Sequence, residues 1–231
     1  MKFNAFIFAR GGSKGLPKKN ILKLGGIPLV AHSINHAKKI KNIHKIFVST
    51  DNKEISEIAQ KYGASVIERP SDLAKDDSPE WLSWQHAIKY VFEKYGKFEG
   101  FISLPTTSPL RSSEDIENCI NSLNNNVDFV ITISDSKRSP WFNMVTNNKD
   151  GNLKLVNEIK NQAIIRRQDV PETFDITTVA YVSKANFILN SESIWDGAVK
   201  GVKIPQKRAI DIDTKMDFEF AKYLYENNFV L

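Results

Sequence analysis

The sequence FNAFIFARGGSKGLPKKN, residues Phe3–Asn20, is the most informative about the fold, because an apolar strand runs directly into a basic, glycine-rich loop. The run Phe3–Ala9 is apolar and aromatic enough to form a strand buried in a sheet. Three glycines let the backbone adopt conformations closed to other residues and let successive amides approach phosphate oxygens: Gly11, Gly12 and Gly15. Four cations surround this cradle: Arg10, Lys14, Lys18 and Lys19. We therefore expect a phosphate-binding loop directly after the first strand.

This loop differs from the two common phosphate-binding motifs. A P-loop requires Gly-Lys-Ser/Thr at a fixed spacing, whereas Leu16 stands five residues after Gly11. A dinucleotide-binding fingerprint requires a second glycine where Ser13 stands. The alternative is a basic surface turn between a strand and a helix. Such a turn requires neither three glycines nor four cations, so the pattern favours a ligand-binding loop.

Beyond the loop, short β-branched or aromatic runs alternate with longer segments of helical period, which is typical of a parallel sheet with crossover helices. Strands are predicted at Phe3–Ala9, Lys45–Ser49, Ser65–Glu68, Gly100–Leu104, Phe129–Ser134, Thr178–Ser183 and Gly201–Ile204. Helices are predicted at Leu29–Lys39, Lys53–Tyr62, Pro79–Tyr95, Ser113–Asn124 and Lys215–Glu226. The order predicts an α/β fold with a Rossmann-like, mostly parallel sheet.

The alternation stops after Ser134. Residues 136–176 contain a turn signal at Lys149–Asn152 between short strand-like runs, which indicates a small β-rich extension. An extension of this size is not stable alone and must pack on the main sheet or on another chain. We expect one domain over residues 1–231 with this extension inserted in it.

Composition narrows the class of protein. The chain has 231 residues, 41% of them hydrophobic, which suits one folded domain and excludes disorder. Its formal charge is +5, to which the first fifty residues contribute +10 and the other 181 contribute −5. A single cysteine, Cys119, excludes a disulfide framework. No apolar run approaches the roughly eighteen residues of a membrane span, and no signal peptide is evident, so we expect a soluble cytoplasmic protein without a membrane partner.

A second motif, DIDTKMD, lies near the C-terminus at Asp211–Asp217. In an extended chain Asp211 and Asp213 point to the same side, where their carboxylates suit a hard divalent cation, while Ile212 turns into the core. Thr214 then caps the last helix. Alternatively, one aspartate is itself the cap and the other is a solvated turn residue.

These stretches resemble one family. RGGSKGLPKKN closely resembles the nucleotide-binding signature of the acylneuraminate cytidylyltransferases, or CMP-sialic acid synthetases, in which the CTP triphosphate lies along this loop. The resemblance continues in order along nearly the whole chain through VSTDNKEISEIAQKYGA, ERPSDLAKD, TTSPLR and DIDTKMD. It implies a fold of the nucleotide-diphospho-sugar transferase type, a homodimer formed through residues 136–176, and transfer of a cytidylyl group from CTP to a 2-keto-3-deoxy sugar acid.

The resemblance also assigns residues to the nucleotide. Matching the family's motifs, the predicted nucleotide-binding residues are Arg10, Gly11, Gly12, Ser13, Lys14, Lys19, Asn20 and Arg69. Catalysis is assigned to Lys19, Asp211 and Asp213, with the two aspartates holding the cofactor Mg²⁺. Arg69 follows the third strand and so lies at the carboxyl edge of the sheet, where open α/β folds bind ligands. A surface ion pair between Arg69 and Asp72 is the alternative.

The residues assigned to the sugar acid match the family less completely. Arg167 and Gln168 match an Arg-Gln pair associated with the acid, and Tyr181 matches an aromatic residue on the following strand. An arginine fork suits a carboxylate, although a dimer-interface ion pair would explain the same residues. The chain departs from the sialic acid pattern at Pro105, Phe142 and Asp175. Asp175 would suit a substrate that presents hydroxyl, amide or amino donors.

The sequence therefore leaves several functions open. Sialic acid and related nonulosonates such as legionaminate or pseudaminate are the first candidates, and an octulosonate is an alternative acceptor. A non-catalytic nucleotide-binding or RNA-binding module is the rival. The acidic remainder and the lack of a basic, aromatic surface argue against a nucleic-acid partner. His32 and His36 stand one helical turn apart but have no third metal ligand nearby in the sequence.

Overall fold

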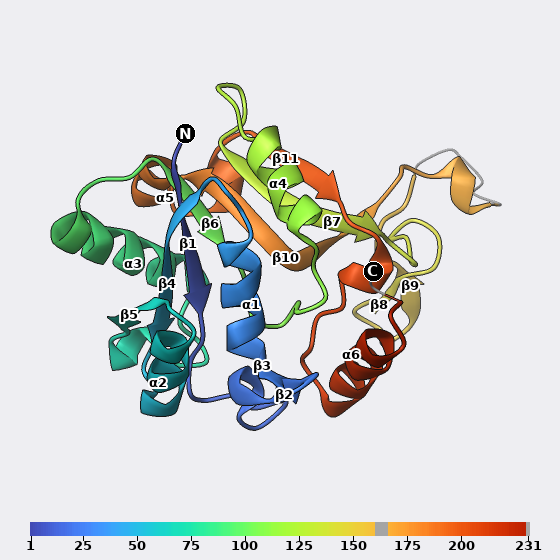
Figure 1. Ribbon diagram of the computed structural model, residues 1–231. Coiled ribbons are helices and arrows are strands. Elements are labelled where there is room, and N and C mark those ends of the chain that lie inside the picture. The colour runs from blue at the N-terminus through green and yellow to red at the C-terminus, as the bar shows by residue number, and fades with distance from the viewer. Residues whose placement is uncertain (160–165, 230–231) are drawn as a thin grey trace.

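The computed structural model describes residues 1–159 and 166–229 and is built on one seven-stranded sheet (Figure 1). The strands, in sheet order, are β11 (Val199–Lys203), β7 (Phe129–Asp135), β10 (Phe174–Lys184), β6 (Gly100–Ser103), β1 (Phe3–Phe8), β4 (Ile43–Thr50) and β5 (Ser65–Glu68). All neighbours are parallel except β10, which is antiparallel to both β6 and β7. The predicted mostly parallel, Rossmann-like sheet is confirmed.

Alternation along the strands produces a core on each face of the sheet. In β1, Ala5 and Ile7 join the core beneath α1 (Leu29–Lys38), α2 (Lys53–Lys61) and α4 (Ser113–Ser122), while Phe6 joins the core beneath α3 (Glu80–Tyr95) and α5 (Ala185–Asn190). The second core is strongly aromatic, and Phe6 lies 5.4 Å from Phe47 and 5.0 Å from Phe101 between ring centroids. Because side chains alternate with a period of two, one apolar run supplies both cores.

Two predicted helices begin with a capping box, and one of the two caps is the expected Thr214. Ser112 accepts a hydrogen bond from the Asp115 amide, and the Asp115 carboxylate accepts one from the Ser112 amide. Thr214 and Asp217 make the same reciprocal arrangement at the start of α6 (Lys215–Glu226). Such capping boxes satisfy amides that the first turn of a helix leaves free. Thr214 is therefore the cap of α6, and neither Asp211 nor Asp213 takes that role.

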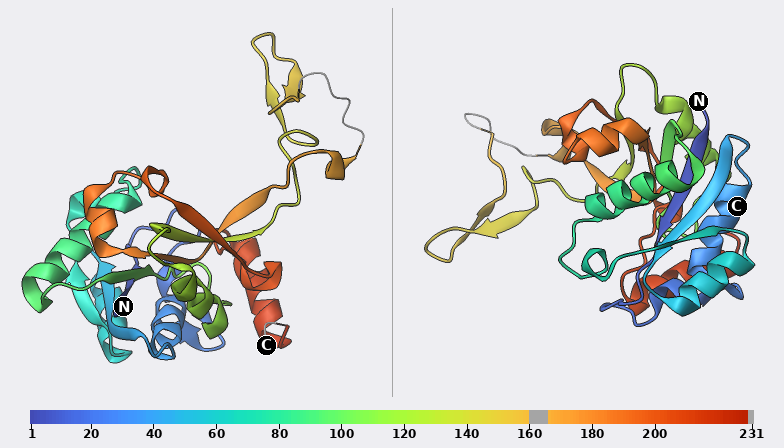
Figure 2. Two further views of the ribbon diagram at one scale, coloured as in Figure 1. Left: turned by 90° about the horizontal axis from the view of Figure 1, so that it is seen from above. Right: turned by 90° about the vertical axis from the view of Figure 1, so that its left-hand side faces the viewer.

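The segment after β7 leaves the body of the molecule as an arm. It carries a short hairpin of β8 (Val145–Asn147) and β9 (Leu153–Leu155), and Figure 2 shows it projecting away from the sheet and helices. The arm rejoins the sheet at Phe174, which pairs with Asp135, so β10 begins four residues earlier than the predicted strand. Large apolar side chains are exposed along the arm and its base: Phe142, Met144, Val145, Leu153, Val156, Phe174 and Ile176.

Several short elements were not predicted. They are the two-residue strands β2 (Lys23–Leu24) and β3 (Ile27–Pro28), helix α5, and 3-10 turns at Lys19–Ile21, Ser71–Leu73, Arg167–Asp169, Ile194–Asp196 and Gln206–Arg208. Each is too short for its apolar residues to repeat with the period of a helix or a strand, so the sequence pattern could not reveal it. Among the described residues, no helix combines the length and apolar character that a membrane crossing requires.

Candidate active site

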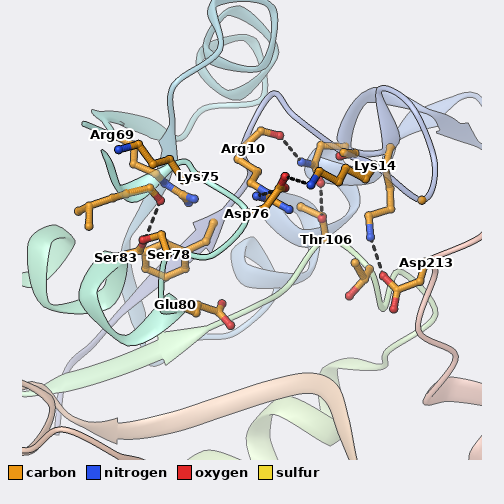
Figure 3. Close-up of a pocket in the computed structure, with 17 residues that line it drawn as sticks. Arg10, Lys14, Arg69, Lys75, Asp76, Ser78, Glu80, Ser83, Thr106 and Asp213 are labelled. Carbon is orange, nitrogen blue, oxygen red and sulfur yellow. Dashed lines mark hydrogen bonds and ion pairs between the residues drawn. The ribbon is translucent and has the colours of Figure 1, made fainter. Parts of the chain in front are cut away.

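A cavity of about 480 Å³ opens at the carboxyl ends of β1, β5 and β6 (Figure 3). The loop after β1 forms one wall, and the segment from Arg69 to the first turn of α3 forms the opposite wall. Thr106 and Thr107 follow β6, and Asp213 precedes α6. Carboxyl ends of parallel strands are the usual ligand-binding edge of such sheets. Six predicted site residues line this one cavity with Asp213: Arg10, Ser13, Lys14, Lys19, Asn20 and Arg69.

The loop after β1 is held by a small polar network. The Gly11 amide donates to Asp51 Oδ1 at 2.8 Å. Asn20 Nδ2 donates to the Arg10 carbonyl at 2.8 Å, and Asn20 Oδ1 accepts from Thr106 Oγ1 at 2.6 Å. Asn20 is 6% exposed, so its amide ties both ends of the loop to the segment after β6 from inside the protein. Asn20 therefore shapes the cradle.

The loop glycines act through close approach rather than through unusual backbone angles. A Cβ on Gly15 would lie 2.6 Å from the Asp213 carbonyl oxygen, and one on Gly11 would lie 2.9 Å from Asn52 Nδ2. Gly12 faces open space. The left-handed residue of this loop is Lys18, with φ of 56°, and not a glycine. The expected conformational freedom of the three glycines is thus corrected: Gly11 and Gly15 are instead required because Asn52 and Asp213 lie too close for a Cβ.

The predicted cations of the cradle already have carboxylate partners. Asp76 bridges two of them, with Oδ1 at 2.7 Å from Arg10 Nη1 and Oδ2 at 2.5 Å from Lys14 Nζ. The hydrogen bond from Lys14 is the main cause that holds the Asp76 pKa below its usual value. Lys19 Nζ lies 2.8 Å from Asp213 Oδ1. Lys18 instead faces Glu54 of α2 at 3.6 Å, so it does not line the cavity.

Arg69 is built into the wall of the cavity. Its Nε donates to Ser49 Oγ at 3.2 Å and its Nη2 donates to the Ser49 carbonyl at 2.9 Å, while the guanidinium lies 5.5 Å from the centre of the Phe8 ring. Arg69 is 7% exposed, and this burial lowers its pKa, an effect that Asp51 and Glu80 partly offset. The alternative surface pair with Asp72 is wrong, because Asp72 pairs with Lys75 at 2.6 Å.

Glu80, the first residue of α3, was not predicted as a site residue but lines the same cavity. Its Oε1 accepts a hydrogen bond from Trp84 Nε1 at 3.2 Å. The side chain is open to the cavity, yet the surrounding walls desolvate the carboxylate and raise its pKa, against the effects of the Trp84 hydrogen bond and of Arg69. Glu80 forms no ion pair within 4.0 Å in the described part of the chain.

The two aspartates of DIDTKMD have the predicted alternation. Ile212 is fully buried and its amide donates to the Thr107 carbonyl at 2.9 Å, while Asp211 and Asp213 are both exposed. Over residues 1–159 and 166–229 no cluster of three or more His, Cys, Asp or Glu side chains could enclose a metal. A pair of carboxylates still fits Mg²⁺, which is usually held by one or two carboxylates together with water and substrate phosphates.

The residues assigned to the sugar acid are not gathered around this cavity. Gln168 and Asp175 line two separate hollows at the base of the arm. Arg167 belongs to a 3-10 turn, and its side chain lies outside what the structure describes. Tyr181 of β10 does not line the cavity either: its ring lies 5.5 Å from that of Trp84 between centroids, and burial raises its pKa to about 12. Phe142 lies on the exposed arm.

Local contacts account for several other residues that the sequence analysis singled out. His32 Nε2 and His36 Nε2 hydrogen-bond the carbonyls of Leu24 and Pro109, at 2.8 and 3.1 Å, so both side chains serve the structure. The Pro105 carbonyl accepts a hydrogen bond from the buried Arg111 guanidinium. Arg166, beside the proposed sugar residues, pairs with Asp169 of its own chain at 3.1 Å.

The sequence reasoning missed several cavity residues: Asp76, Ser78, Glu80, Ser83, Thr106 and Thr107. Four of them follow Arg69 within fourteen residues, so the position of Arg69 after a strand was the available signal. Thr106 lies in the TTSPLR motif, which was recognised as a resemblance without a role. Polar side chains after the ends of β5 and β6 belong to the same sheet edge as the glycine-rich loop.

Comparison with known proteins identifies the family. A family model described as cytidylyltransferase matches residues 5–231. A post-translational flagellin modification protein B from Campylobacter coli is 35% identical over 94% of this chain and 92% of that protein. A CMP-N,N'-diacetyllegionaminic acid synthase from Campylobacter jejuni is 34% identical over 94% and 92% of the two chains. The solved structure of a CMP:2-keto-3-deoxy-manno-octonic acid synthetase complexed with CTP has the same fold, with 16% identity, a TM-score of 0.69 and coverage of 99% and 100%.

The sheet is Rossmann-like, and the match to the family model over residues 5–231 places the chain among the nucleotidyltransferases. Within that class, the chain belongs to the cytidylyltransferase family.

Proposed function

We propose that this protein transfers a cytidylyl group from CTP to a nonulosonic acid, a 2-keto-3-deoxy sugar acid of the sialic, legionaminic or pseudaminic type. The observation that carries the proposal is the set of three cations, Arg10, Lys14 and Lys19, on one wall of a cavity at the sheet edge. Relatives named for legionaminic and pseudaminic acid match 94% or more of the chain. These names support a nonulosonate as the acceptor.

The chemistry follows from the charges in the cavity. The anomeric oxygen of the acid attacks the α-phosphorus of CTP, the bond from that phosphorus to the oxygen bridging it to the β-phosphorus breaks, and pyrophosphate leaves. Negative charge grows on the departing oxygen. Arg10, Lys14 and Lys19 stabilise it, because pre-positioned cations at a developing charge lower the barrier without reorganisation.

Asp211 and Asp213 are the proposed residues for Mg²⁺. Asp213 lines the cavity, Asp211 is exposed two residues before it, and the Ile212 amide holds the segment between them to Thr107. Mg²⁺ bound there would screen the charge of the triphosphate and of the departing pyrophosphate. Lys19, which contacts Asp213, links the aspartate segment to the glycine-rich loop.

We further propose that the protein is a cytoplasmic homodimer in which the arm contacts a second copy. The exposed apolar side chains Val145, Leu153 and Val156 lie on an arm that projects from the body. Exposed apolar clusters of this kind are typical of protein interfaces. Gln168 and Asp175 line hollows at the base of the same arm. A second copy that contacts the arm would cover these hollows, which supports a role for both residues in binding the acid.

Pyrophosphate release tests this function. The protein is incubated with CTP, Mg²⁺ and one acid at a time: N-acetylneuraminate, N,N'-diacetyllegionaminate, pseudaminate or a 2-keto-3-deoxy-octulosonate. We expect release with at least one nonulosonate and formation of the corresponding CMP-sugar. Release with the octulosonate alone would contradict the acceptor class. Binding of labelled RNA without a thermal shift by CTP would contradict the enzymatic function.

A further inference from the structure

A second cavity, of about 530 Å³, shares no lining residue with the cavity proposed to bind CTP, which is called the nucleotide cavity below. Helix α1, strand β3, residues 109–113 and the end of α6 surround this second cavity. Its charged lining residues are Lys39 and Arg111, and no aspartate or glutamate of the described part of the chain lines it. The second cavity therefore has the size of a small-molecule site and an excess of positive charge.

Arg111 is one of the largest fully buried side chains in the described residues. Its guanidinium donates to the Pro105 carbonyl and lies 3.5 Å from Ser33 Oγ, whereas its Nε is buried without a hydrogen-bond partner there. Asp115 pairs with Arg208 at 2.8 Å, and no ion pair within 4.0 Å joins Arg111 to a described carboxylate. Burial lowers the pKa of Arg111 to about 9. Because a buried charge without a counterion is costly, an anion beside Arg111 would stabilise the protein.

His36 adds a hydrogen-bond acceptor to the same cavity. Its Nε2 lies 3.1 Å from the Pro109 carbonyl, which can only accept, so Nε2 carries the hydrogen of the ring. Burial and the charge of Arg111 lower the pKa of His36 to about 3, so the ring is neutral and Nδ1 keeps its lone pair. Nδ1 is buried and has no partner among the described residues. An acceptor for Arg111 Nε and a donor for His36 Nδ1 are both missing.

A hydrogenphosphate group supplies both. Its bare oxygens accept hydrogen bonds from a guanidinium, and its remaining O–H donates to a neutral imidazole nitrogen. A water molecule makes the same two hydrogen bonds but leaves the charges of Arg111 and Lys39 uncompensated. Ser113, the first residue of α4, also lines the cavity, and the start of a helix favours an anion. The residues therefore fit a hydrogenphosphate group better than water.

We propose that the second cavity is a binding site for a hydrogenphosphate group, either as the free ion or as a phosphate monoester. The site stabilises residues 105–111, the segment that Arg111 closes on the Pro105 carbonyl. The same segment supports the nucleotide cavity, because Thr106 Oγ1 donates to Asn20 Oδ1 at 2.6 Å and the Thr107 carbonyl accepts from the Ile212 amide at 2.9 Å. Bound phosphate is thus expected to stabilise the folded protein.

Thermal unfolding with inorganic phosphate or sulfate, at equal ionic strength and without CTP or acid, tests the site. Sulfate has the same shape but carries no O–H at neutral pH. We expect phosphate to raise the unfolding temperature saturably, by about 2–4 °C at about five times its dissociation constant. Sulfate should give a much smaller rise, because it leaves His36 Nδ1 unpaired. Equal rises would overturn the proposal, since they reflect exclusion of salts from the protein surface.

Two neighbouring lysines provide a matched pair of variants. Lys39→Gln removes an exposed cation of the cavity and should raise the half-saturating phosphate concentration about twofold to fivefold, as for an exposed charge contact. Lys38→Gln is the control, because Lys38 lies over Gly63 outside the cavity and should leave that concentration unchanged. Arg111→Lys keeps a charge without the N–H at the Nε position and should abolish the saturable rise. If this buried substitution prevents folding, equal responses of Lys39→Gln and Lys38→Gln still overturn the proposal.

Lys14→Gln distinguishes the second cavity from the cationic loop of the nucleotide cavity. The saturable rise should persist in Lys14→Gln. A rise lost there and retained in Lys39→Gln would overturn the proposal and assign the phosphate to the nucleotide cavity. Because neither CTP nor acid is present, failure of the proposed transfer reaction would leave this result standing.

The source of the phosphate group is identified by comparing inorganic phosphate with glycerol 3-phosphate. Both are titrated at about pH 6, where roughly half of a phosphate monoester keeps its O–H. The lower half-saturating concentration identifies the free ion or the ester as the preferred ligand. A saturable rise with neither would overturn the proposal.

Discussion

The cavity at the sheet edge and the arm differ in whether a single chain brings their assigned site residues together. Around the cavity, the cations, the buried Arg69 and the Asn20 network come from distant parts of the chain and meet within one hollow. At the arm, Gln168 and Asp175 line separate hollows and apolar side chains face outward. The contrast supports the proposal that the body binds the nucleotide, and that the arm binds the acceptor once a second copy covers it.

The largest expected effect tests the phosphate side of this comparison. Asp213→Asn should lower turnover by at least about a hundredfold, because a metal ion supplies several kcal/mol of charge stabilisation and each ~1.4 kcal/mol is tenfold in rate. Thermal unfolding should change little, since Thr214 and not Asp213 caps α6. The measurement is pyrophosphate release at saturating Mg²⁺. Turnover near that of wild type would exclude the assigned metal role.

A smaller loss is expected from the cation beside that aspartate. Lys19→Ala should lower kcat by about tenfold to a thousandfold, as for the loss of one charge contact in a transition state. The control is Lys18→Asn in the same loop, where lysine faces Glu54 outside the cavity and asparagine tolerates the positive φ. Stopped assays of pyrophosphate release compare both variants. Equal losses in the two would show a general effect of loop charge.

These two predictions concern residues that the sequence already indicated, and the reason is local. A strand, a glycine-rich loop and a pair of alternating aspartates keep their geometry over a few residues, so their motifs carry the information. Glu80 belongs to no such motif, and its position after Arg69 was its only signal. Glu80 resembles any acidic residue in the first turn of a helix, and only the packing of α3 against the sheet brings it into the cavity.

The sequence also could not predict that β10 runs antiparallel to its neighbours. A strand has the same period in either direction, and the connection through the arm, which sets the direction, has weak periodicity of its own. Sequence therefore predicted the parallel core and the place of the glycine-rich loop at the sheet edge, whereas the residues of the acceptor side came only from the resemblance.

The glycine packing offers a test on stability. Gly15→Ala places a Cβ against the Asp213 carbonyl, a backbone atom that yields only if the loop or the aspartate segment moves. We expect a loss of about 1–3 kcal/mol in the free energy of unfolding, typical of overpacking. Gly12→Ala, with open space around it, should leave that free energy nearly unchanged. The free energy of unfolding of both variants is measured by denaturant titration. Equal values for Gly15→Ala and Gly12→Ala would contradict the tight contact at Gly15.

The smallest expected effect tests the arm. Gln168→Ala should raise KM for the acid by about twofold to tenfold, the range of one net hydrogen bond of ~0.5–1.5 kcal/mol. The dissociation constant of CTP should stay as in wild type, because Gln168 lies outside the nucleotide cavity. Initial rates at varied acid concentration provide the value. An unchanged KM would remove Gln168 from the acceptor site.

The division of labour between body and arm is tested most directly by one steady-state experiment. Pyrophosphate release is measured while CTP and the acid are varied together, for wild type, Lys19→Ala and Gln168→Ala in parallel. We predict that Lys19→Ala lowers kcat and kcat/KM for CTP, whereas Gln168→Ala changes only the KM for the acid. A change in kcat/KM for CTP in Gln168→Ala, equal to its change for the acid, would contradict separate nucleotide and acceptor sites.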